Sequence, residues 1–262
     1  MIDLQEKAKR VRQQILEMAI SSQRGHLGGS LSCVEILLAL YYEVMGKHDR
    51  FILSKGQGCQ TLYAILADLG HFPVEELRTF CQKGSRLEGH PSNNVPGVFV
   101  SSGSLGNGLG IGAGWALASK LDGMDRNIYV LLGDGECYEG SVWEAAMFAS
   151  HHQLTNLIGI IDRNYQCVLD FTEDINKLEP LAYKWRAFGW NVKEVNGHNV
   201  REVVDALYHK NNHFFGDTRP LMVIARTIKG KGISFMEKGI KWHGGVPNEE
   251  EVEIARRELY GY

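Results

Sequence analysis

Residues 128–136 read Ile-Tyr-Val-Leu-Leu-Gly-Asp-Gly-Glu, a continuous apolar run that leads directly into Gly-Asp-Gly. Such an uninterrupted run is typical of a strand in a parallel sheet that is covered on both faces. A second apolar run, residues 157–161, ends in Asp162-Arg163-Asn164. The helical pattern between the two runs makes this segment a β-α-β unit, whose strands end at the same edge of a sheet. We therefore expect Asp134 and Asn164 at neighbouring strand ends.

Short apolar runs alternate with helical patterns along the rest of the chain. We expect strands at residues 51–53, 98–100, 128–132, 157–162, 192–195 and 221–225. We expect helices at residues 61–69, 73–81, 106–120, 143–152, 180–188 and 200–209. This alternation predicts an α/β fold, a doubly wound, mostly parallel sheet with helices on both faces. No internal repeat or linker interrupts the pattern, so we expect a single domain over residues 1–262.

The first forty residues predict two more helices. Apolar residues recur at helical spacing from Leu4 to Met18. A second helix is expected to begin near Ser32, because Ser32 and Glu35 have the spacing of a capping box and precede an apolar run.

Composition excludes several classes of protein. Hydrophobic residues make up 44% and charged residues 23% of the 262 residues, which is typical of a globular domain, and the formal charge of −3 gives no reason to expect nucleic-acid binding. The five cysteines never form a CxxC pair, so a metal-thiolate or redox motif is not expected. No apolar run is long enough to span a membrane, and the charged N-terminus does not resemble a signal peptide. We expect a cytoplasmic protein that binds neither membrane nor nucleic acid.

Gly133-Asp134-Gly135 has the chemistry of a metal–diphosphate site. Asp134 is a hard carboxylate of the kind that Mg²⁺ and Ca²⁺ prefer, and the glycines allow the backbone to approach a bulky anion. A lone Gly-Asp-Gly is more often an ordinary turn. The order strand, Gly-Asp-Gly, helix, strand and Asn favours the metal site, because carboxylate, amide and carbonyl oxygens leave coordination positions for phosphate oxygens.

This arrangement resembles the thiamine diphosphate signature, and further segments resemble the transketolase family. In chain order they are residues 25–32 (GHLGGSLS), 50–56 (RFILSKG), 89–98 (GHPSNNVPGV), 102–110 (SGSLGNGLG), 133–144 (GDGECYEGSVWE), 225–232 (ARTIKGKG) and 242–244 (WHG). The resemblance runs from about residue 8 to about residue 250. It implies a thiamine-diphosphate-binding fold and the pyrophosphate-binding half of a transketolase.

The resemblance also implies roles for individual residues. The metal ligands would be Asp134, Asn164 and the backbone carbonyl of Gln166. Gly133 and Gly135 would lie at the diphosphate, Gly135 through its N–H, and Lys229 would add positive charge there. Gly103, through its carbonyl, and Leu105 would meet the aminopyrimidine ring.

Three histidines and a glutamate are the other residues to which the resemblance assigns a role. His26, His90 and His243 would line the channel above the reactive carbon of the cofactor, where histidine can exchange protons and hydrogen-bond sugar hydroxyls. Glu139, with Glu144, would belong to a carboxylate network at the subunit boundary near the cofactor. A solvated helix face is the alternative for both glutamates.

Gln57 departs from the family pattern, which has histidine at this position after Ser-Lys-Gly. Glutamine keeps a hydrogen-bond donor and acceptor but cannot carry a proton at neutral pH. We therefore expect an acceptor other than an ordinary aldose phosphate.

No segment of the chain resembles the second domain of transketolases, which supplies the glutamate that activates the cofactor. The resemblance therefore implies a separate C-terminal transketolase subunit, an α₂β₂ assembly, and transfer of a two-carbon ketol unit between sugars or sugar phosphates. Alternatives are an enzyme like 1-deoxyxylulose-5-phosphate synthase, an enzyme like the α subunit of a 2-oxoacid dehydrogenase, and a non-catalytic scaffold subunit of the same fold.

Overall fold

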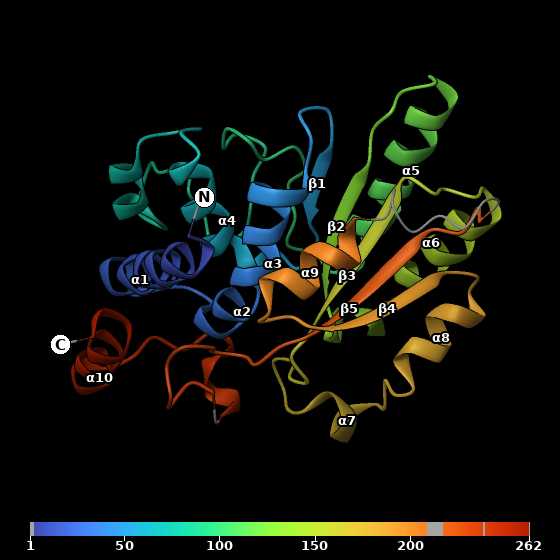
Figure 1. Ribbon diagram of the computed structural model, residues 1–262. Helices are drawn as coiled ribbons and strands as arrows, with labels where there is room; N and C mark the ends of the chain where they lie inside the picture. Colours follow the sequence, from blue (N-terminus) through green and yellow to red (C-terminus); the bar gives the residue numbers. More distant parts are fainter. Residues whose placement is uncertain (1–2, 209–216, 238, 262) are drawn as a thin grey trace.

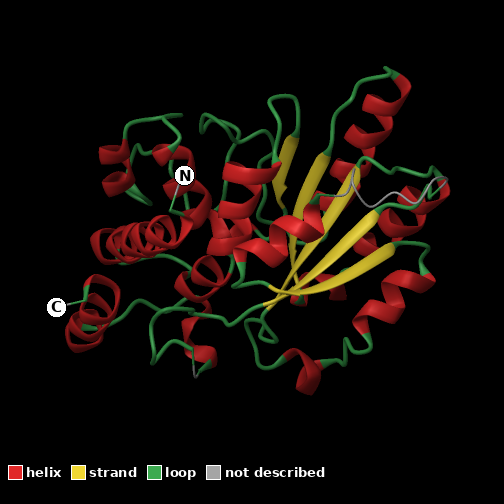
Figure 2. Ribbon diagram, viewed as in Figure 1, coloured by secondary structure: helices red, strands yellow, loops and turns green. Residues whose placement is uncertain are grey.

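The computed structural model describes residues 3–208, 217–237 and 239–261, and its centre is a five-stranded parallel sheet (Figures 1 and 2). The strand order is β1-β2-β3-β5-β4. The strands are β1 (Arg50–Leu53), β2 (Ile128–Gly133), β3 (Leu157–Arg163), β4 (Asn191–Asn196) and β5 (Leu221–Arg226). The predicted α/β fold is confirmed, and each of these strands agrees with its predicted bounds to within one residue at either end.

Helices and helical turns surround this sheet. The α-helices are α1 (Leu4–Ser22), α2 (Leu27–Ser32), α3 (Val34–Ala39), α4 (Cys59–Asp68), α5 (Gly108–Leu121), α6 (Gly140–His151), α7 (Thr172–Ile175), α8 (Leu181–Ala187), α9 (Val200–Leu207) and α10 (Glu249–Tyr260). The π-helical turn is η1 (Leu40–Val44), and the 3₁₀ turns are η2 (Gly56–Gly58), η3 (Val74–Thr79), η4 (Gly135–Tyr138) and η6 (Ile240–His243).

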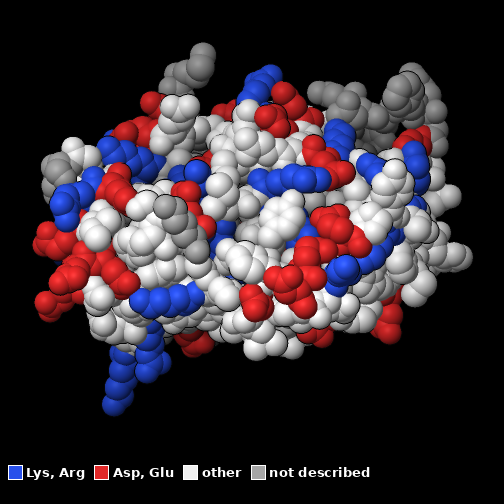
Figure 3. Space-filling model, turned by 90° about the horizontal axis from the view of Figure 1, so that it is seen from below, with Lys and Arg blue, Asp and Glu red and all other residues white. Residues whose placement is uncertain are grey.

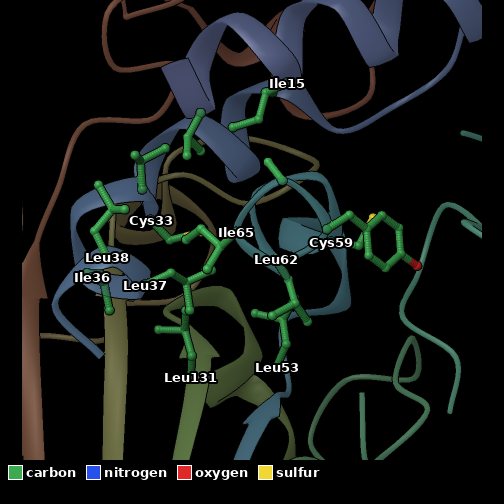
Figure 4. Packing of buried hydrophobic residues seen from close by; sticks show 14 of the residues in the cluster. Ile15, Cys33, Ile36, Leu37, Leu38, Leu53, Cys59, Leu62, Ile65 and Leu131 are labelled. Atoms are coloured by element: carbon green, nitrogen blue, oxygen red, sulfur yellow. The ribbon is translucent and has the colours of Figure 1, made fainter. Parts of the chain in front are cut away.

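Successive residues of β2 enter two different cores, which explains its continuous apolar run. Tyr129 and Leu131 pack with residues of α1, α2, α3, α4 and α9 on one face of the sheet; Figure 4 shows part of this cluster. Val130 and Leu132 pack with residues of α5, α6 and α8 on the other face. A strand covered on both faces needs apolar side chains at every position, and this removes the polar alternation of a half-exposed strand.

Two predicted elements differ from the structure. Residues 98–100 were expected to form a strand, but they lie in an irregular segment, where the Val98 N–H donates to the Val95 carbonyl at 3.0 Å. Their apolar character reflects tertiary contacts, because Val98 packs into the core while Phe99 is exposed. The helix expected at residues 73–81 is the 3₁₀ turn η3.

The expected capping box at Ser32 and Glu35 is wrong. Ser32 is the last residue of α2, and its hydroxyl donates to Asp162 Oδ2 at 2.6 Å. The Glu35 carboxylate is bound by Arg12 and His198. Both side chains have long-range polar partners, which a local spacing rule does not reveal.

The register of β2 with β3 decides where the polar residues fall. Gly133 pairs with Asp162, so Asp134 and Asn164 follow two neighbouring strands at the same edge of the sheet, as predicted. In open α/β sheets, ligands bind at this edge, beyond the carboxyl ends of the strands. The loops after β2, β3 and β5 therefore frame the candidate site.

Candidate cofactor-binding site

A cavity of about 250 Å³ lies at the carboxyl ends of β2 and β3. Its lining residues are Gly29, Lys55, Gln57, Leu105, Gly133, Asp134, Gly135, Glu136, Tyr138, Asn164, Gln166, Cys167, Val168, Leu169, Ile175, Lys229 and His243. The side of the molecule that carries α7, at the bottom of Figure 1, faces the reader in Figure 3, where acidic and basic side chains are interspersed. The cavity combines a buried polar floor with the apolar side chains of Val168, Leu169 and Ile175.

Asp134 is the acidic group of this floor and is 1% exposed. Its Oδ1 accepts the Gly135 N–H at 2.8 Å, and its Oδ2 accepts the Tyr165 N–H at 2.6 Å and Arg163 Nη1 at 3.2 Å. Burial, and next the charge of Asp162, raise the pKa of Asp134 to about 6, although Arg163 and the backbone N–H groups oppose the shift. The carboxylate is thus preoriented by donors, and a cation that approached it would favour its charged form.

Arg163 organises the loop that follows β3, and sequence reasoning did not single it out. Its buried guanidinium donates to Asp134, to Thr172 Oγ1 at 2.7 Å and to Glu173 Oε1 at 2.7 Å. It also lies over the ring of Tyr165, 4.1 Å from the centroid. One side chain therefore fixes Asp134 relative to the loop that carries the other predicted metal ligands.

Asn164 and Gln166 line the same cavity. Asn164 Oδ1 accepts the Gln166 N–H at 3.2 Å, and the Gln166 carbonyl accepts Lys229 Nζ at 3.4 Å. Gln166 Oε1 is buried without a hydrogen-bond partner among the residues that the structure describes. Within those residues, no group of three or more His, Cys, Asp or Glu is placed to hold a metal ion. The predicted ligand set differs from such a group, because it contains one carboxylate, one amide and one backbone carbonyl. These three hard oxygens leave coordination positions on a metal open to other ligands.

Lys229 reaches the cavity from the segment after β5. Its ammonium donates to the Gln166 and Cys167 carbonyls and, at 3.0 Å, to His243 Nδ1. Burial lowers the pKa of Lys229 to about 8. Because Lys229 has no acceptor lone pair while charged, His243 must accept in this bond.

The three predicted histidines come together, although they are 64 and 153 positions apart along the chain (90 − 26 and 243 − 90). The ring centroids of His26 and His90 are 5.5 Å apart, and those of His26 and His243 are 5.7 Å apart. His26 Nδ1 is buried and has no hydrogen-bond partner in the described part of the chain. The pKa of His26 is lowered, first by burial and then by His90 and Lys229. Of the three histidines, His243 is among the residues that line the cavity, whereas His26 and His90 are not.

Replacing Lys229 with Met is expected to raise the pKa of His243. Burial, followed by the charges of Lys229 and His26, lowers that pKa to about 4. Without the Lys229 ammonium, one positive charge that disfavours protonated His243 would be gone. Burial would still lower the pKa of His243. The His243 titration midpoint in an NMR pH series should therefore move up without reaching the ordinary 6.5. An unchanged midpoint would contradict the Lys229–His243 contact, and Lys231→Met, on a partly exposed neighbour, is the matched control.

Glu136 is a second buried acid at the site, and sequence reasoning missed it. Its carboxylate accepts from the Ser54 hydroxyl, from the Gly106 N–H at 2.9 Å and from the Gly133 N–H at 3.1 Å. Gly106 has φ +85°, and a Cβ there would lie 2.5 Å from Ser141 Oγ, so the turn requires glycine. Glu136 thus ties together three sequence motifs, and burial raises its pKa.

A buried ion pair joins Lys55, which lines the cavity, to Asp162. Lys55 Nζ bonds Asp162 Oδ2 and donates to the Gly29 carbonyl at 2.7 Å. Asp162 also accepts from Ser32 and Thr227. Asp162, which the sequence marked only as a strand end, therefore joins β3 to α2, to the segment after β1 and to the segment after β5.

The other predicted site residues fall into three groups. Gly133, Gly135, Leu105 and Gln57 line the cavity, and the Gly135 N–H, expected at a diphosphate, donates to Asp134 here. Gly103 lies beside His90, 3.5 Å from His90 Cγ when a Cβ is added. Glu139, the residue before α6, and Glu144, within α6, are exposed and are not among the lining residues.

Comparison with known proteins points to one family. Residues 4–262 match the family described as "Transketolase, thiamine diphosphate binding domain". The chain is 40% identical to a protein of Phocaeicola vulgatus that is named as one subunit of an apulose-4-phosphate transketolase, over 98% of this chain and 93% of that protein. It is 41% identical to "6-deoxy-6-sulfo-D-fructose transketolase subunit SqwG" of Clostridium sp. (strain MSTE9), over 98% of this chain and 96% of that protein.

Longer transketolases, one of them with a solved structure, match the chain as well. The chain superposes on transketolase from Campylobacter jejuni with a TM-score of 0.90 and 30% identity, and the match covers 99% of this chain and 43% of that one. It is 35% identical to transketolase of Homo sapiens, over 98% of this chain and 42% of that protein. The chain thus spans about two fifths of these longer transketolases, but nearly the whole of the proteins named as subunits.

Proposed function

The chain belongs to the transketolase thiamine diphosphate binding domain family, and from this premise we propose that its cavity binds thiamine diphosphate through Mg²⁺ or Ca²⁺. The observation that carries the proposal is the convergence of Asp134, Asn164 and Gln166 on one cavity. Asp134, Asn164 Oδ1 and the Gln166 carbonyl would be the protein ligands. Three hard oxygens suit either metal and leave positions for phosphate oxygens and water.

The surrounding residues fit a diphosphate. Lys229 brings an ammonium to the cavity beside the Gln166 carbonyl, where it would offset part of the phosphate charge. Gly133 and Gly135 border the cavity without side chains, and a Cβ on Gly135 would lie 3.0 Å from Cys167 Cβ. A bulky anion can therefore approach the backbone there. Leu105, Val168, Leu169 and Ile175 would contact the apolar parts of the cofactor.

We further propose transfer of a two-carbon ketol unit from a ketose donor to an aldehyde acceptor. When bound, thiamine diphosphate supplies carbanion chemistry that the side chains of the protein cannot. His26, His90 and His243 would bind substrate hydroxyls and exchange protons with them. Their clustering supports this role, and the lowered pKa values of His26 and His243 keep both imidazoles neutral near pH 7. Because His243 Nδ1 accepts from Lys229, the other ring nitrogen of His243 would donate to a substrate oxygen.

The substrates would be sugars or sugar phosphates, handled in an active site shared with a second polypeptide. Relatives of this length are named as subunits, which supports a separate partner chain. We propose an α₂β₂ enzyme in the cytoplasm, with Glu139 and Glu144 at a boundary between subunits. No helix in the described residues is long and apolar enough to cross a membrane.

The partner requirement is tested by calorimetric titration of thiamine diphosphate with Mg²⁺. We expect weak binding to this chain alone and tight binding to its complex with the C-terminal subunit. Equal affinity in the two samples would contradict a composite site. Product analysis then separates the alternatives: decarboxylation of a 2-oxoacid would favour the synthase-like or dehydrogenase-like enzymes, and binding without turnover would favour the scaffold.

Gln57→His should change the choice of acceptor. Gln57 lines the cavity and is partly exposed within it, so a substrate can reach its amide. Histidine would add a titratable group and change which hydroxyls or phosphates are hydrogen-bonded. The ratio of kcat/KM values for two aldehyde acceptors should change by about tenfold, the worth of one or two hydrogen bonds. An unchanged acceptor profile in the reconstituted complex would refute this role.

A further inference from the structure

Three polar side chains form a hydrogen-bonded row outside the cavity. Arg12 of α1 donates through Nη2 to Glu35 Oε1 at 2.7 Å and to Oε2 at 3.0 Å. His198, in the turn between β4 and α9, contacts Glu35 Oε2 through Nδ1 at 3.0 Å. Arg12 and Glu35 are 7% and 8% exposed. We call this row, Arg12–Glu35–His198, the clamp.

The two ends of the clamp hold the backbone on either side of Lys229. The Ile228 N–H donates to His198 Nε2 at 2.8 Å, and Arg12 Nε donates to the Lys231 carbonyl at 2.9 Å. These two backbone positions lie immediately before Lys229 and two residues after it. The clamp therefore fixes the direction in which the Lys229 side chain leaves the backbone, toward the cavity.

Between these two points the backbone has little freedom. Gly230 has φ +80°, and a Cβ there would lie 2.5 Å from Met236 Cβ. Its N–H donates to the Gly28 carbonyl at 3.0 Å. If the clamp were lost, a shift of its backbone contacts would therefore move this short, stiff turn, and the Lys229 side chain would move with it.

The hydrogen bonds require one tautomer of His198. Because Nε2 accepts the Ile228 N–H, it carries no proton, and Nδ1 must be the protonated nitrogen that donates to Glu35. Glu35 must then accept from both neighbours. Burial alone would raise the pKa of Glu35, but His198 and Arg12 outweigh burial and hold this pKa below its ordinary value.

We propose that the clamp positions Lys229, and through it the Gln166 carbonyl and His243, for binding of the cofactor diphosphate. Its members are positioning residues, since none of them lines the cavity. The inference rests on the proposed thiamine diphosphate site. The chemical reason is that a buried ammonium binds a diphosphate well only if its side chain is held in one orientation. Residues around metal ligands orient those ligands in the same way.

His198 is the member of the clamp to substitute, because its side chain is 13% exposed, slightly more than those of Arg12 and Glu35. His198→Phe removes both the acceptor for Ile228 and the donor to Glu35. His198→Gln retains an amide oxygen that can reach the Ile228 N–H. In the complex with Mg²⁺, the Kd for thiamine diphosphate should rise about 10- to 100-fold with Phe, in line with other supporting residues of metal sites, and recover largely with Gln.

The control is Glu17→Gln, which loses a more exposed ion pair with Arg256 between α1 and α10 and does not touch the clamp. It should leave the Kd unchanged. An unchanged Kd in His198→Phe, or equal weakening by Phe and Gln, would overturn the proposal in favour of simple packing.

A second measurement on the full chain without cofactor separates failure of the clamp from failure of the proposed function. In ¹⁵N-histidine NMR spectra, His198 should carry its proton on Nδ1. The His243 titration midpoint should move upward in His198→Phe, as Lys229 leaves its position 3.0 Å from Nδ1. Protonated Nε2 in the wild type, or an unmoved His243 midpoint, would overturn the clamp whether or not thiamine diphosphate binds.

Discussion

Asp134→Asn is expected to weaken metal-dependent binding of thiamine diphosphate by about a hundredfold or more. Substitutions of residues that only support metal ligands typically cost about 10- to 100-fold in metal affinity, and Asp134 is proposed as a direct ligand. Asparagine keeps the shape but removes the negative charge that a divalent cation requires. Arg163 would retain its bonds to Thr172 and Glu173, so the loop after β3 should keep its conformation.

Calorimetry with Mg²⁺ on the two-subunit complex measures this effect. Asp174→Asn is the matched control, because Asp174 is exposed in α7 and does not line the cavity. Its affinity should equal that of the wild type. If Asp134→Asn binds the cofactor as tightly as Asp174→Asn does, the metal is not held at Asp134.

Lys55→Met is expected to lower the free energy of unfolding by about 3–5 kcal/mol, the usual cost of removing one partner of a buried ion pair. Lys55 and Asp162 are 4% and 0% exposed, so the remaining carboxylate could not be solvated in place. The hydroxyls of Ser32 and Thr227 would still donate to it but carry no charge.

Urea unfolding of the single variants and of Lys55→Met combined with Asp162→Asn separates charge from packing. The double variant should be more stable than Lys55→Met alone, because no unpaired charge would remain. Additive losses would mean that the pair contributes little beyond the volume of its side chains. Lys7→Met, which breaks a partly exposed pair with Asp68, should cost less than about 1 kcal/mol.

The strands and the site edge could be predicted because they depend on local patterns. The run in β2 is apolar at every position since each residue meets one of two cores, and the Gly-Asp-Gly that follows can only lie at the carboxyl edge. The β-α-β connection then brings Asn164 beside Asp134. Residues 98–100 misled the same reasoning, because a short apolar run in an irregular, partly buried segment looks like a strand.

The supporting polar groups could not be predicted because their partners are far away in sequence. Ser54 and Glu136 are 82 positions apart, and Lys55 and Asp162 are 107 apart. In the sequence, Glu136 is only an acid after a glycine, and Arg163 is only a basic residue at a strand end. Their roles depend on which loops the sheet order brings together, and the clamp at His198 depends on α1 and α3 in the same way.

The central claim is most directly tested by anomalous X-ray diffraction from crystals of the two-subunit complex grown with Mn²⁺ and thiamine diphosphate. Mn²⁺ occupies the oxygen sites that Mg²⁺ prefers and is visible by its anomalous signal. A single peak within coordination distance of Asp134, Asn164 Oδ1 and the Gln166 carbonyl is the predicted result. A peak at other residues, or a cofactor bound in the cavity without a metal at Asp134, would contradict the account.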